Sequence, residues 1–191
     1  GWAPLLYLGQ DIHHKTLGIV GFGRIGQAMA KRASGFDMKV LYYTAHRRPQ
    51  AEEEKHGVEY RPLDDLLRES DFISLHVPLV GETRHLIGRR EFDLMKPNAI
   101  LINTARGPVV DEKALVEALK TGKIAGAGLD VFEQEPKIEP ELLELDNVTI
   151  VPHIGSASVA TRTKMSIMTA ENIIAVFDGK IPQNLVNKEI V

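Results

Sequence analysis

Three side chains, Arg106, Glu135 and His153, are of the types needed to bind a carboxylate and to move a proton beside it. The Arg106 guanidinium can grip a carboxylate through two parallel hydrogen bonds and polarise a neighbouring carbonyl group. The His153 imidazole suits the transfer of one proton near neutral pH. Glu135 could lie beside His153, raise its pKa by favouring the charged imidazole, and fix its tautomer. We therefore interpret these three residues as candidate catalytic groups.

Each of these residues, taken singly, also has a purely structural interpretation. Arg106 could be a surface arginine paired with a nearby acid, His153 a hydrogen-bonded packing residue, and Glu135 a solvated loop acid. Their separation along the chain leaves open whether they meet in space.

Residues 17–26, Leu-Gly-Ile-Val-Gly-Phe-Gly-Arg-Ile-Gly, predict a buried strand, a glycine-rich turn and the start of a helix. Gly21 permits the tight turn, Gly23 lets the backbone approach a pyrophosphate, and Gly26 lets the helix pack close to the strand. The free N–H groups and the positive dipole end of the helix then face the phosphates. A lone Gly-x-Gly-x-x-Gly is a weak signal, but its position between a strand and a helix predicts a dinucleotide site.

The second predicted strand ends in Thr44, where an NAD-binding domain usually has an acidic residue that holds the adenosine ribose. A carboxylate about 4 Å from a 2′-phosphate would cost on the order of 4 kcal/mol at a surface-like dielectric, and Thr44 removes that barrier. His46, Arg47 and Arg48 offer donors and positive charge suited to a phosphate. These residues predict a preference for NADP(H); the alternative is that Arg47 and Arg48 are solvated loop charges.

Short apolar runs alternate with helical patterns, which is typical of βαβ units and a mostly parallel sheet. Predicted strands cover residues 17–20, 38–43, 58–60, 72–77, 99–103, 127–131 and 148–151, and the longer helical patterns cover 26–32, 63–68, 114–119 and 159–177. The expected fold class is therefore α/β, a Rossmann-type doubly wound sheet of about seven strands with helices on both faces. Residues 1–191 are expected to form one dinucleotide-binding domain.

In a parallel sheet all strands point the same way, so that ligands bind just beyond their carboxyl ends. The residues that follow the predicted strands should therefore line one crevice; they are Gly21, Thr44, Pro78, Thr104, Arg106, Asp130 and His153.

Composition narrows the class of protein. The formal net charge is −3 without a block of lysine and arginine, so neither nucleic acid nor an anionic membrane is expected as a partner. The chain has no cysteine, which excludes disulfides and cysteine metal sites and fits a reducing, cytoplasmic location. No apolar run approaches the roughly 20 residues of a membrane helix. The chain starts at Gly1 without a signal-peptide pattern, and we expect further sequence upstream.

Other polar residues carry no signal of chemistry in the sequence. No spacing of histidines and carboxylates suggests a metal site, and no Gly-x-Ser-x-Gly nucleophile elbow is present. Residues 52–54, three glutamates, are expected to form an exposed helix face. The remaining histidines outside the Thr44–Arg48 loop are expected to be structural or on the surface; they are His13, His14, His56, His76 and His85.

Several of these motifs, in this order, resemble the D-isomer-specific 2-hydroxyacid dehydrogenases, and the resemblance covers nearly the whole chain. The motifs are residues 17–26, 103–107, 126–136 and 152–157. The Trp2-Ala3-Pro4 segment, Tyr42-Tyr43-Thr44 and residues 156–162 are most similar to the glyoxylate/hydroxypyruvate reductase branch.

The resemblance implies reduction of a small 2-keto acid such as glyoxylate or hydroxypyruvate. A reduced nicotinamide would give hydride to the 2-keto carbon, His153 would protonate the oxygen, Glu135 would support His153, and Arg106 would bind the substrate carboxylate. NADP(H) is the expected cofactor and NAD(H) the alternative. The implied cofactor-binding residues are Gly21, Gly23, Arg24, Ile25, Gly26, Thr44, Ala45, His46, Arg47, Arg48, Val77, Pro78, Thr104, Ala105, Asp130, Ile154 and Gly155.

The same resemblance implies a substrate domain upstream of this chain and a homodimer formed through the cofactor domain. Two other functions stay open. One is an NAD-dependent D-2-hydroxyacid dehydrogenase of the phosphoglycerate or D-lactate type. The other is a non-catalytic, nucleotide-sensing module of the corepressor kind, against which the presence of Arg106, Glu135 and His153 argues.

Overall fold

The computed structural model describes the chain except for residues 1–2, 4–5, 7, 188 and 190–191. Trp2 and Pro4 of the segment that resembles the reductase branch lie outside the described residues. Two compact units divide the chain, one over residues 1–152 and one over residues 153–191. The expectation of one dinucleotide-binding domain over residues 1–191 stays a prediction.

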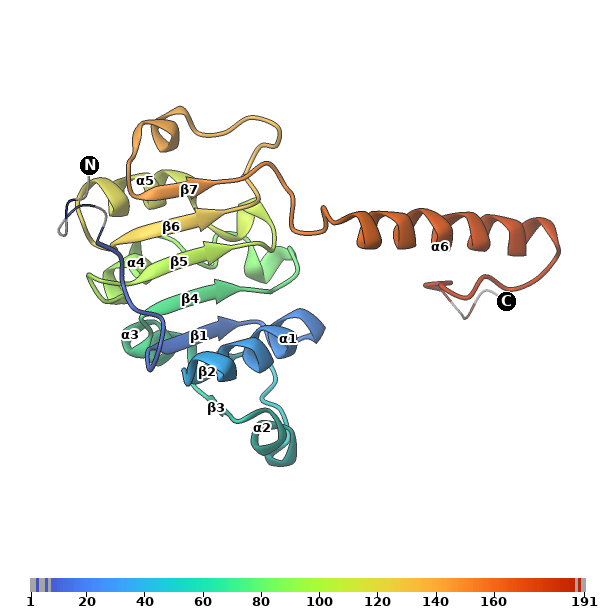
Figure 1. The fold of residues 1–191 in the computed structure, drawn as a ribbon, viewed down its shortest axis with the longest axis horizontal. Helices are drawn as coiled ribbons and strands as arrows, with labels where there is room; N and C mark the ends of the chain where they lie inside the picture. Colours follow the sequence, from blue (N-terminus) through green and yellow to red (C-terminus); the bar gives the residue numbers. More distant parts are fainter. Residues whose placement is uncertain (1–2, 4–5, 7, 188, 190–191) are drawn as a thin grey trace. The chain divides into compact units, whose positions relative to one another are not determined.

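The first unit contains a parallel sheet in which, over the described residues, seven strands lie in the order β3-β2-β1-β4-β5-β6-β7 (Figure 1). The bounds are β1 Thr16–Val20, β2 Lys39–Tyr43, β3 Val58–Tyr60, β4 Phe72–Leu75, β5 Ile100–Asn103, β6 Gly126–Leu129 and β7 Val148–Ile150. The direction of winding reverses between β1 and β4, which is the topological switch point where open α/β sheets bind ligands. The predicted Rossmann-type sheet is confirmed.

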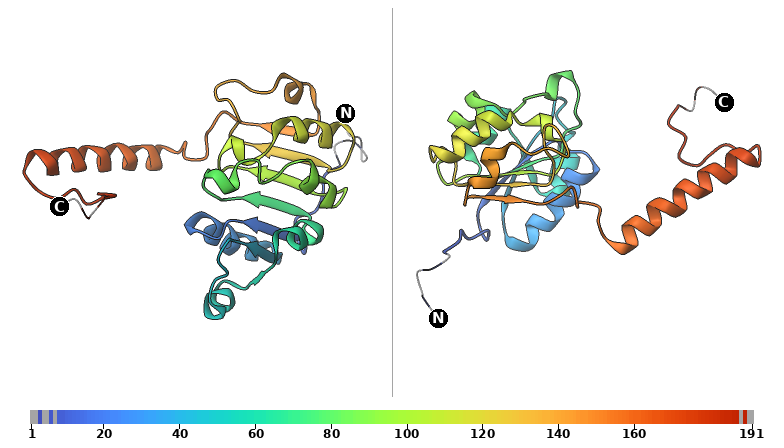
Figure 2. Two further views of the ribbon diagram at one scale, coloured as in Figure 1. Left: turned by 180° about the vertical axis from the view of Figure 1, so that it is seen from behind. Right: turned by 90° about the horizontal axis from the view of Figure 1, so that it is seen from above.

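Helices cover both faces of this sheet (Figure 2). Their bounds are α1 Arg24–Ala33, α2 Gln50–His56, α3 Leu63–Glu69, α4 Arg89–Leu94 and α5 Glu112–Lys120. Side chains of β1 pack into two hydrophobic cores, one on each face of the sheet. Leu17 and Ile19 belong to the core shared with α1, and Val20 belongs to the core shared with α3, α4 and α5. The sheet is therefore buried through its centre, which explains the continuous apolar runs of its strands.

Local signals set the ends of several helices as expected. Asp111 caps α5 by accepting a hydrogen bond from the Ala114 N–H at 3.1 Å, and Gly122 follows α5 with a φ of +69°. Helix α4 was not among the expected elements. Its six residues are too short to give a helical period, and Phe92 is its buried apolar anchor.

The second unit consists of an initial loop, the helix α6 Val159–Phe177 and a short end segment. Ser158 caps α6 by accepting from the Thr161 N–H at 3.2 Å, and Gly179 follows it with a φ of +68°. Among the described helices, none combines the length and apolar character of a membrane-crossing segment.

Candidate active site

The strand registers align the carboxyl ends of neighbouring strands. Val20 of β1 is paired with Tyr43 of β2 and with Leu75 of β4, and the alignment continues through Asn103 of β5 and Leu129 of β6. The residues that follow these ends therefore form one row along the edge of the sheet, as predicted for Gly21, Thr44, Pro78, Thr104, Arg106 and Asp130. The functional roles of these residues stay predictions.

The turn after β1 has the geometry that a pyrophosphate requires. Gly21 has a φ of +99°, and a Cβ there would lie 2.6 Å from the carbonyl carbon of His76. A Cβ on Gly26 would lie 2.2 Å from the Gly21 carbonyl oxygen, so only glycine lets α1 pack this close to the turn. A Cβ on Gly23 would meet nothing within 4 Å, which leaves open space for a ligand beside the backbone. The turn fits a dinucleotide in each of these respects.

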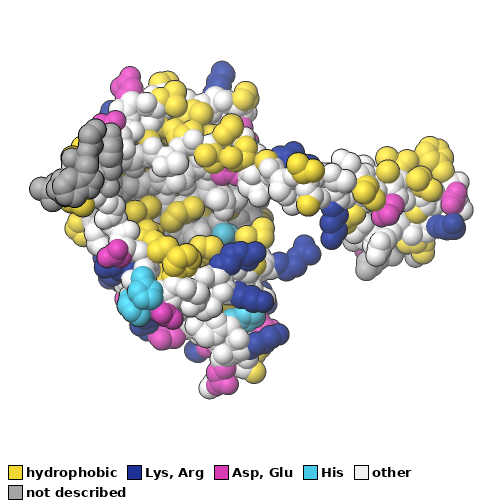
Figure 3. All heavy atoms as spheres, in the orientation of Figure 1, with side chains coloured by type: hydrophobic (Ala, Val, Ile, Leu, Met, Phe, Trp, Pro, Cys, Tyr) yellow, Lys and Arg dark blue, Asp and Glu magenta, His cyan; other side chains and the backbone are white. Residues whose placement is uncertain are grey.

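The amino end of α1 is open to an anion. Gly23 precedes the helix without a side-chain cap, and the first turn holds no acidic residue. The first hydrogen bond of the helix runs from the Gln27 N–H to the Gly23 carbonyl oxygen, at 3.0 Å, so the N–H groups of residues 24–26 have no intrahelical acceptor. Figure 3 shows lysine and arginine side chains gathered over α1. These features favour phosphate binding.

Beside this turn lies a hollow of about 520 Å³. It is lined by Arg24, Ile25, Ala28, Met29, Arg32 and His76. His76 bonds through Nε2 to the Ser74 hydroxyl at 2.9 Å, and burial lowers its pKa. The lowered pKa favours the neutral imidazole, which adds no charge beside the glycine turn.

The loop after β2 is held by a buried carboxylate. Glu53 accepts two hydrogen bonds from the Arg47 guanidinium, at 2.8 and 2.9 Å, and one from the Tyr42 hydroxyl at 2.7 Å. The hydrogen bonds from Arg47 and then Tyr42 lower the pKa of Glu53 to about 2. Burial, with the hydrogen bond to Glu53, raises the pKa of Tyr42 to about 12. The expectation of an exposed face over residues 52–54 is therefore wrong for Glu53, which is 7% exposed.

Arg47 and Arg48 thus differ from each other. Arg47 is ion-paired, but its side chain is 60% exposed and keeps donors that face solvent. Arg48 donates from its guanidinium to the Phe22 carbonyl oxygen at 3.3 Å, and from its backbone to the Tyr42 hydroxyl at 3.0 Å. Its Nε is buried without a hydrogen-bond partner. Arg48 therefore ties the loop after β2 to the glycine turn. Thr44 is half-buried, and Ala45 and His46 are exposed beside it.

Asn103 shapes the turn that carries Thr104, Ala105 and Arg106. Its buried side chain accepts from the Ala105 N–H and donates to the Arg106 carbonyl oxygen, each at 3.0 Å. The Arg106 guanidinium is exposed and donates to the Ala105 carbonyl oxygen at 2.6 Å. Asn103 thereby fixes the backbone of the residue expected to bind a carboxylate.

The turn at Arg106 packs directly on the segment that leads to Glu135. A Cβ on Gly107 would lie 1.9 Å from the carbonyl group of Phe132, so the two backbones touch. Glu135 in turn accepts a hydrogen bond from the Phe132 N–H at 3.0 Å. Phe132 thus links the Arg106 turn to the Glu135 side chain.

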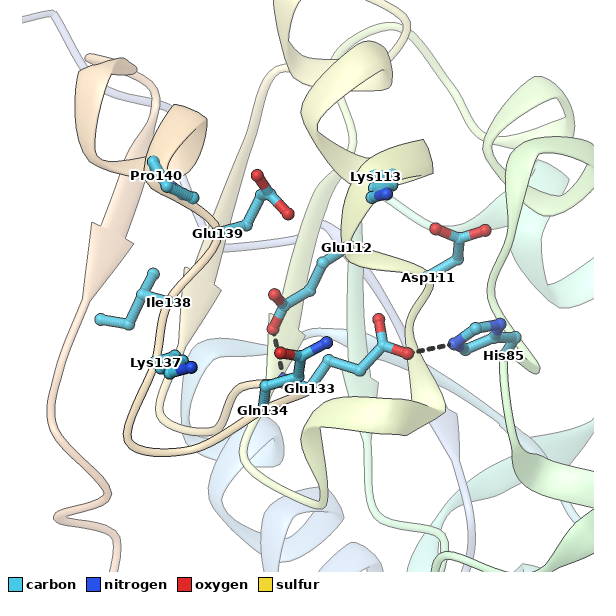
Figure 4. A pocket seen from close by; sticks show the side chains of 10 residues that line it. All are labelled: His85, Asp111, Glu112, Lys113, Glu133, Gln134, Lys137, Ile138, Glu139 and Pro140. Carbon is cyan, nitrogen blue, oxygen red and sulfur yellow. Dashed lines mark hydrogen bonds and ion pairs between the residues drawn. The ribbon is translucent and has the colours of Figure 1, made fainter.

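A second carboxylate, Glu112, holds the same segment from the other side. It lies at the start of α5, is 7% exposed, and accepts a hydrogen bond from the Glu133 N–H. Burial raises the pKa of Glu112. Glu133 also pairs with His85 at 2.7 Å, and both residues line a pocket of about 700 Å³ beside this segment (Figure 4).

Val77 and Pro78 follow β4, and the Pro78 carbonyl oxygen accepts from the Thr83 hydroxyl at 2.6 Å. Asp130 is buried, and its N–H donates to the Asn103 carbonyl oxygen at 3.0 Å. His153, Ile154 and Gly155 belong to the second unit and are exposed there. His153 has a φ of +53°, a left-handed conformation that is uncommon outside glycine.

The residues that position the others were not among the candidates predicted from the sequence. Glu112 and the Tyr42–Glu53 pair act through contacts with segments that the sequence pattern does not bring together. Asn103 acts locally, on Ala105 and Arg106 of the turn that follows it. For Glu112 the available signal was its place in the first turn of α5, next to the cap Asp111.

Comparison with known proteins agrees with this geometry. Residues 1–155 match the family model described as the NAD binding domain of D-isomer specific 2-hydroxyacid dehydrogenases. The chain belongs to this family. The match also supports a nicotinamide dinucleotide as the ligand of the glycine turn.

The curated relatives include a glyoxylate reductase from Thermococcus litoralis, 61% identical over 191 residues, which cover 100% of this chain and 57% of that protein. A D-lactate dehydrogenase with NAD+ from Lactobacillus jensenii has a TM-score of 0.84 and 34% identity, over 97% of this chain and 59% of that one. An NADPH-dependent glyoxylate/hydroxypyruvate reductase from Sinorhizobium meliloti has a TM-score of 0.78 and 40% identity, over 85% of this chain and 50% of that one. The chain thus spans little more than half the length of the relatives it matches.

Proposed function

We propose that this chain is the cofactor-binding part of an NADPH-dependent reductase of small 2-keto acids such as glyoxylate or hydroxypyruvate. The observation that carries the proposal is the contact of Gly107 with the Phe132 carbonyl, because it joins the Arg106 turn to the Glu135 segment. Both segments belong to the sheet edge that also presents the glycine turn. The 61% identity to a glyoxylate reductase supports the substrate class.

A reduced nicotinamide supplies a hydride when it is bound, and the residues of the chain supply the rest. Arg106 holds the substrate carboxylate through its exposed guanidinium and thereby orients the 2-keto carbon for hydride transfer. His153 gives one proton to the carbonyl oxygen, so that one hydride and one proton convert the keto acid to the 2-hydroxy acid. Glu135 acts on His153 as a partner that favours the charged imidazole. The roles of Glu135 and His153 rest on the family resemblance.

The preference for NADPH rests on the loop after β2. Thr44 brings no negative charge to the adenosine ribose, and Arg47 has a side chain that is 60% exposed. The ion pair with Glu53 lessens the net charge of Arg47 but leaves solvent-facing donors for a phosphate. The similarity to an NADPH-dependent reductase favours the same choice, whereas the similarity to an enzyme with NAD+ represents the alternative.

The proposal can be tested on the intact protein. Steady-state assays of a panel of 2-keto acids with NADPH and NADH should show turnover of glyoxylate or hydroxypyruvate with NADPH. Fluorescence titration should show tighter binding of NADPH than of NADH; NADH binding about tenfold tighter would overturn the cofactor assignment.

His153→Asn should abolish turnover, and unchanged turnover would favour the nucleotide-sensing alternative. By the same family resemblance we propose a homodimer, which sedimentation can test.

A further inference from the structure

A group of metal-ligand side chains lies at the opposite edge of the sheet, where the strands begin. His13, His14 and Asp37 each offer a ligand atom, and these atoms all lie within 4.8 Å of one another. Among the described residues, this is the group of three histidine or acidic side chains whose geometry could hold a metal ion. The spacing along the sequence did not indicate it, because Asp37 is distant in the chain and only the fold brings it close.

A tight turn and the left-handed backbone of His14 bring the two imidazoles together. His13 and His14 are the central residues of a turn closed by a hydrogen bond from the Lys15 N–H to the Ile12 carbonyl oxygen, at 3.3 Å. His14 has a φ of +60°, and the two imidazole rings lie 3.8 Å apart between centroids. In extended backbone adjacent side chains point to opposite sides, so this turn is what places both rings together.

Asp37 reaches the turn from the segment that connects α1 to β2. The carbonyl oxygen of Phe36 accepts from the His14 N–H at 3.1 Å, and the Lys39 N–H donates to the Lys15 carbonyl oxygen at 3.0 Å. Asp37, with a φ of +49°, places its carboxylate 3.9 Å from Nε2 of His13. The ligand group is thus held by backbone hydrogen bonds on both sides.

The hydrogen bonding of His13 prepares its other nitrogen to bind a metal. Nδ1 lies 2.9 Å from the Phe36 carbonyl oxygen. A carbonyl oxygen only accepts, so Nδ1 carries the hydrogen, and in the neutral imidazole the lone pair is then on Nε2, on the side of Asp37. Metal-binding histidines characteristically donate their second ring nitrogen to a carbonyl or carboxylate in this way.

We propose that His13, His14 and Asp37 bind a divalent transition cation of the Zn²⁺ class, with water completing the coordination. Imidazole and carboxylate ligands suit zinc, whose bonds of about 2.0–2.2 Å place tetrahedral ligand atoms about 3.3–3.6 Å apart. The present separations are at most 4.8 Å, and all three side chains are exposed, so they must turn toward one another to reach that range. The cation then joins the turn before β1 to the segment before β2.

This site is separate from the candidate active site. The five residues of β1 lie between them, and at about 3.3 Å per residue they span roughly 16 Å. The cation is therefore expected to stabilise the folded state and to leave cofactor binding unchanged.

The test uses the intact, untagged protein after removal of metals, titrated with ZnCl₂ by calorimetry and with CoCl₂ by visible absorption. His14→Gly removes a ligand and suits the positive φ, so this variant should fold and bind Zn²⁺ at least about tenfold more weakly. Asp37→Asn should weaken binding in the same direction. Asp11→Asn is the control: it removes one negative charge, as Asp37→Asn does, from the exposed loop that carries His13 and His14. Asp11 is not a member of the ligand group, so this variant should bind Zn²⁺ as the parent protein does. Equal Zn²⁺ affinity in the parent protein and in both His14→Gly and Asp37→Asn would overturn the proposal.

Thermal unfolding gives an independent reading. Because a ligand that binds only the folded state raises the midpoint, Zn²⁺ should raise the unfolding temperature of the parent protein and of Asp11→Asn. The rise should be clearly smaller in His14→Gly, because this variant binds Zn²⁺ more weakly. A rise of the same size in His14→Gly would place the cation elsewhere and would also overturn the proposal.

Discussion

At the scale of single residues, the carboxylate of Glu53 holds the loop after β2 through three hydrogen bonds. It joins Tyr42, Arg47 and, through the Tyr42 hydroxyl, the backbone of Arg48. All three partners belong to β2 or to the loop that is expected to hold the adenosine end of the cofactor. A buried charge with several donors is costly to disturb, because each donor loses its acceptor at once.

Glu53→Gln should therefore destabilise the protein by about 2 kcal/mol at pH 7, since hydrogen bonds to a charged acceptor are lost. The pKa of Glu53 is lowered from 4.5 to about 2, so its contribution is present above pH 4.5 and is lost as the pH falls toward 2. Urea unfolding of both proteins at pH 7 and at pH 3 measures this. Glu52→Gln, which alters the neighbouring residue, serves as the control. A difference that grows as the pH falls would contradict the assignment.

Thr44→Asp tests the basis of cofactor choice. A carboxylate at this position would repel a 2′-phosphate and accept hydrogen bonds from ribose hydroxyls. NADPH should bind about tenfold or more weakly, and NADH at least as well as to the parent protein. Fluorescence titration of Thr44→Asp against Thr44→Ser separates the effect of the charge from that of the side-chain size. Unchanged NADPH affinity would show that the 2′-phosphate of the cofactor does not bind at this loop.

At the scale of elements, two glycines of the turn before α1 have different tasks: Gly23 is expected to serve cofactor binding, and Gly26 the packing of α1. A Cβ on Gly23 meets open space, whereas a Cβ on Gly26 meets the backbone of Gly21. Gly23→Ala should leave stability within about 0.5 kcal/mol of the parent, since nothing in the protein is displaced. It should nevertheless weaken NADPH binding by about tenfold or more, because the added methyl group occupies the approach of the pyrophosphate.

Gly26→Ala should act on folding first, because the added methyl group forces α1 away from β1 and lowers the free energy of unfolding by more than about 1 kcal/mol. Cofactor binding should then weaken as a consequence of the displaced helix. Thermal unfolding and NADPH titration of the two variants together provide the comparison. Similar losses of stability in both would show that the turn does not have the described shape.

Sequence patterns predicted the elements better than the contacts between them. The apolar runs gave the seven strands to within about two residues at each end, and Asp111 and Gly122 marked α5 correctly. Burial of Glu53 was missed because α2 has charged residues on both sides of it and no apolar period. Glu112 was missed as a positioning residue because its partner Glu133 is distant in the chain, and sequence spacing carries no record of such a pairing. The partners of Asn103 lie in its own turn, at Ala105 and Arg106, so an asparagine at the start of that turn was a local signal.

At the scale of the whole molecule, all members of the two hydrophobic cores lie within residues 1–152. A chain that ends at Pro152 should therefore unfold cooperatively by itself. Circular dichroism during heating, compared with the full chain, measures this cooperativity. A broad transition would show that residues 153–191 are needed to complete the fold.

The glycine turn is supported by strands that come later in the chain. Gly21 donates to the Tyr43 carbonyl oxygen at 2.8 Å, and its Cα faces the backbone of His76. A ribosome synthesises these residues in order, and the turn lacks its supports until β4 has emerged from the exit tunnel. The growing polypeptide therefore becomes able to capture a dinucleotide only after more than a third of this sequence has been translated, although the Gly-x-Gly-x-x-Gly motif itself is complete at Gly26.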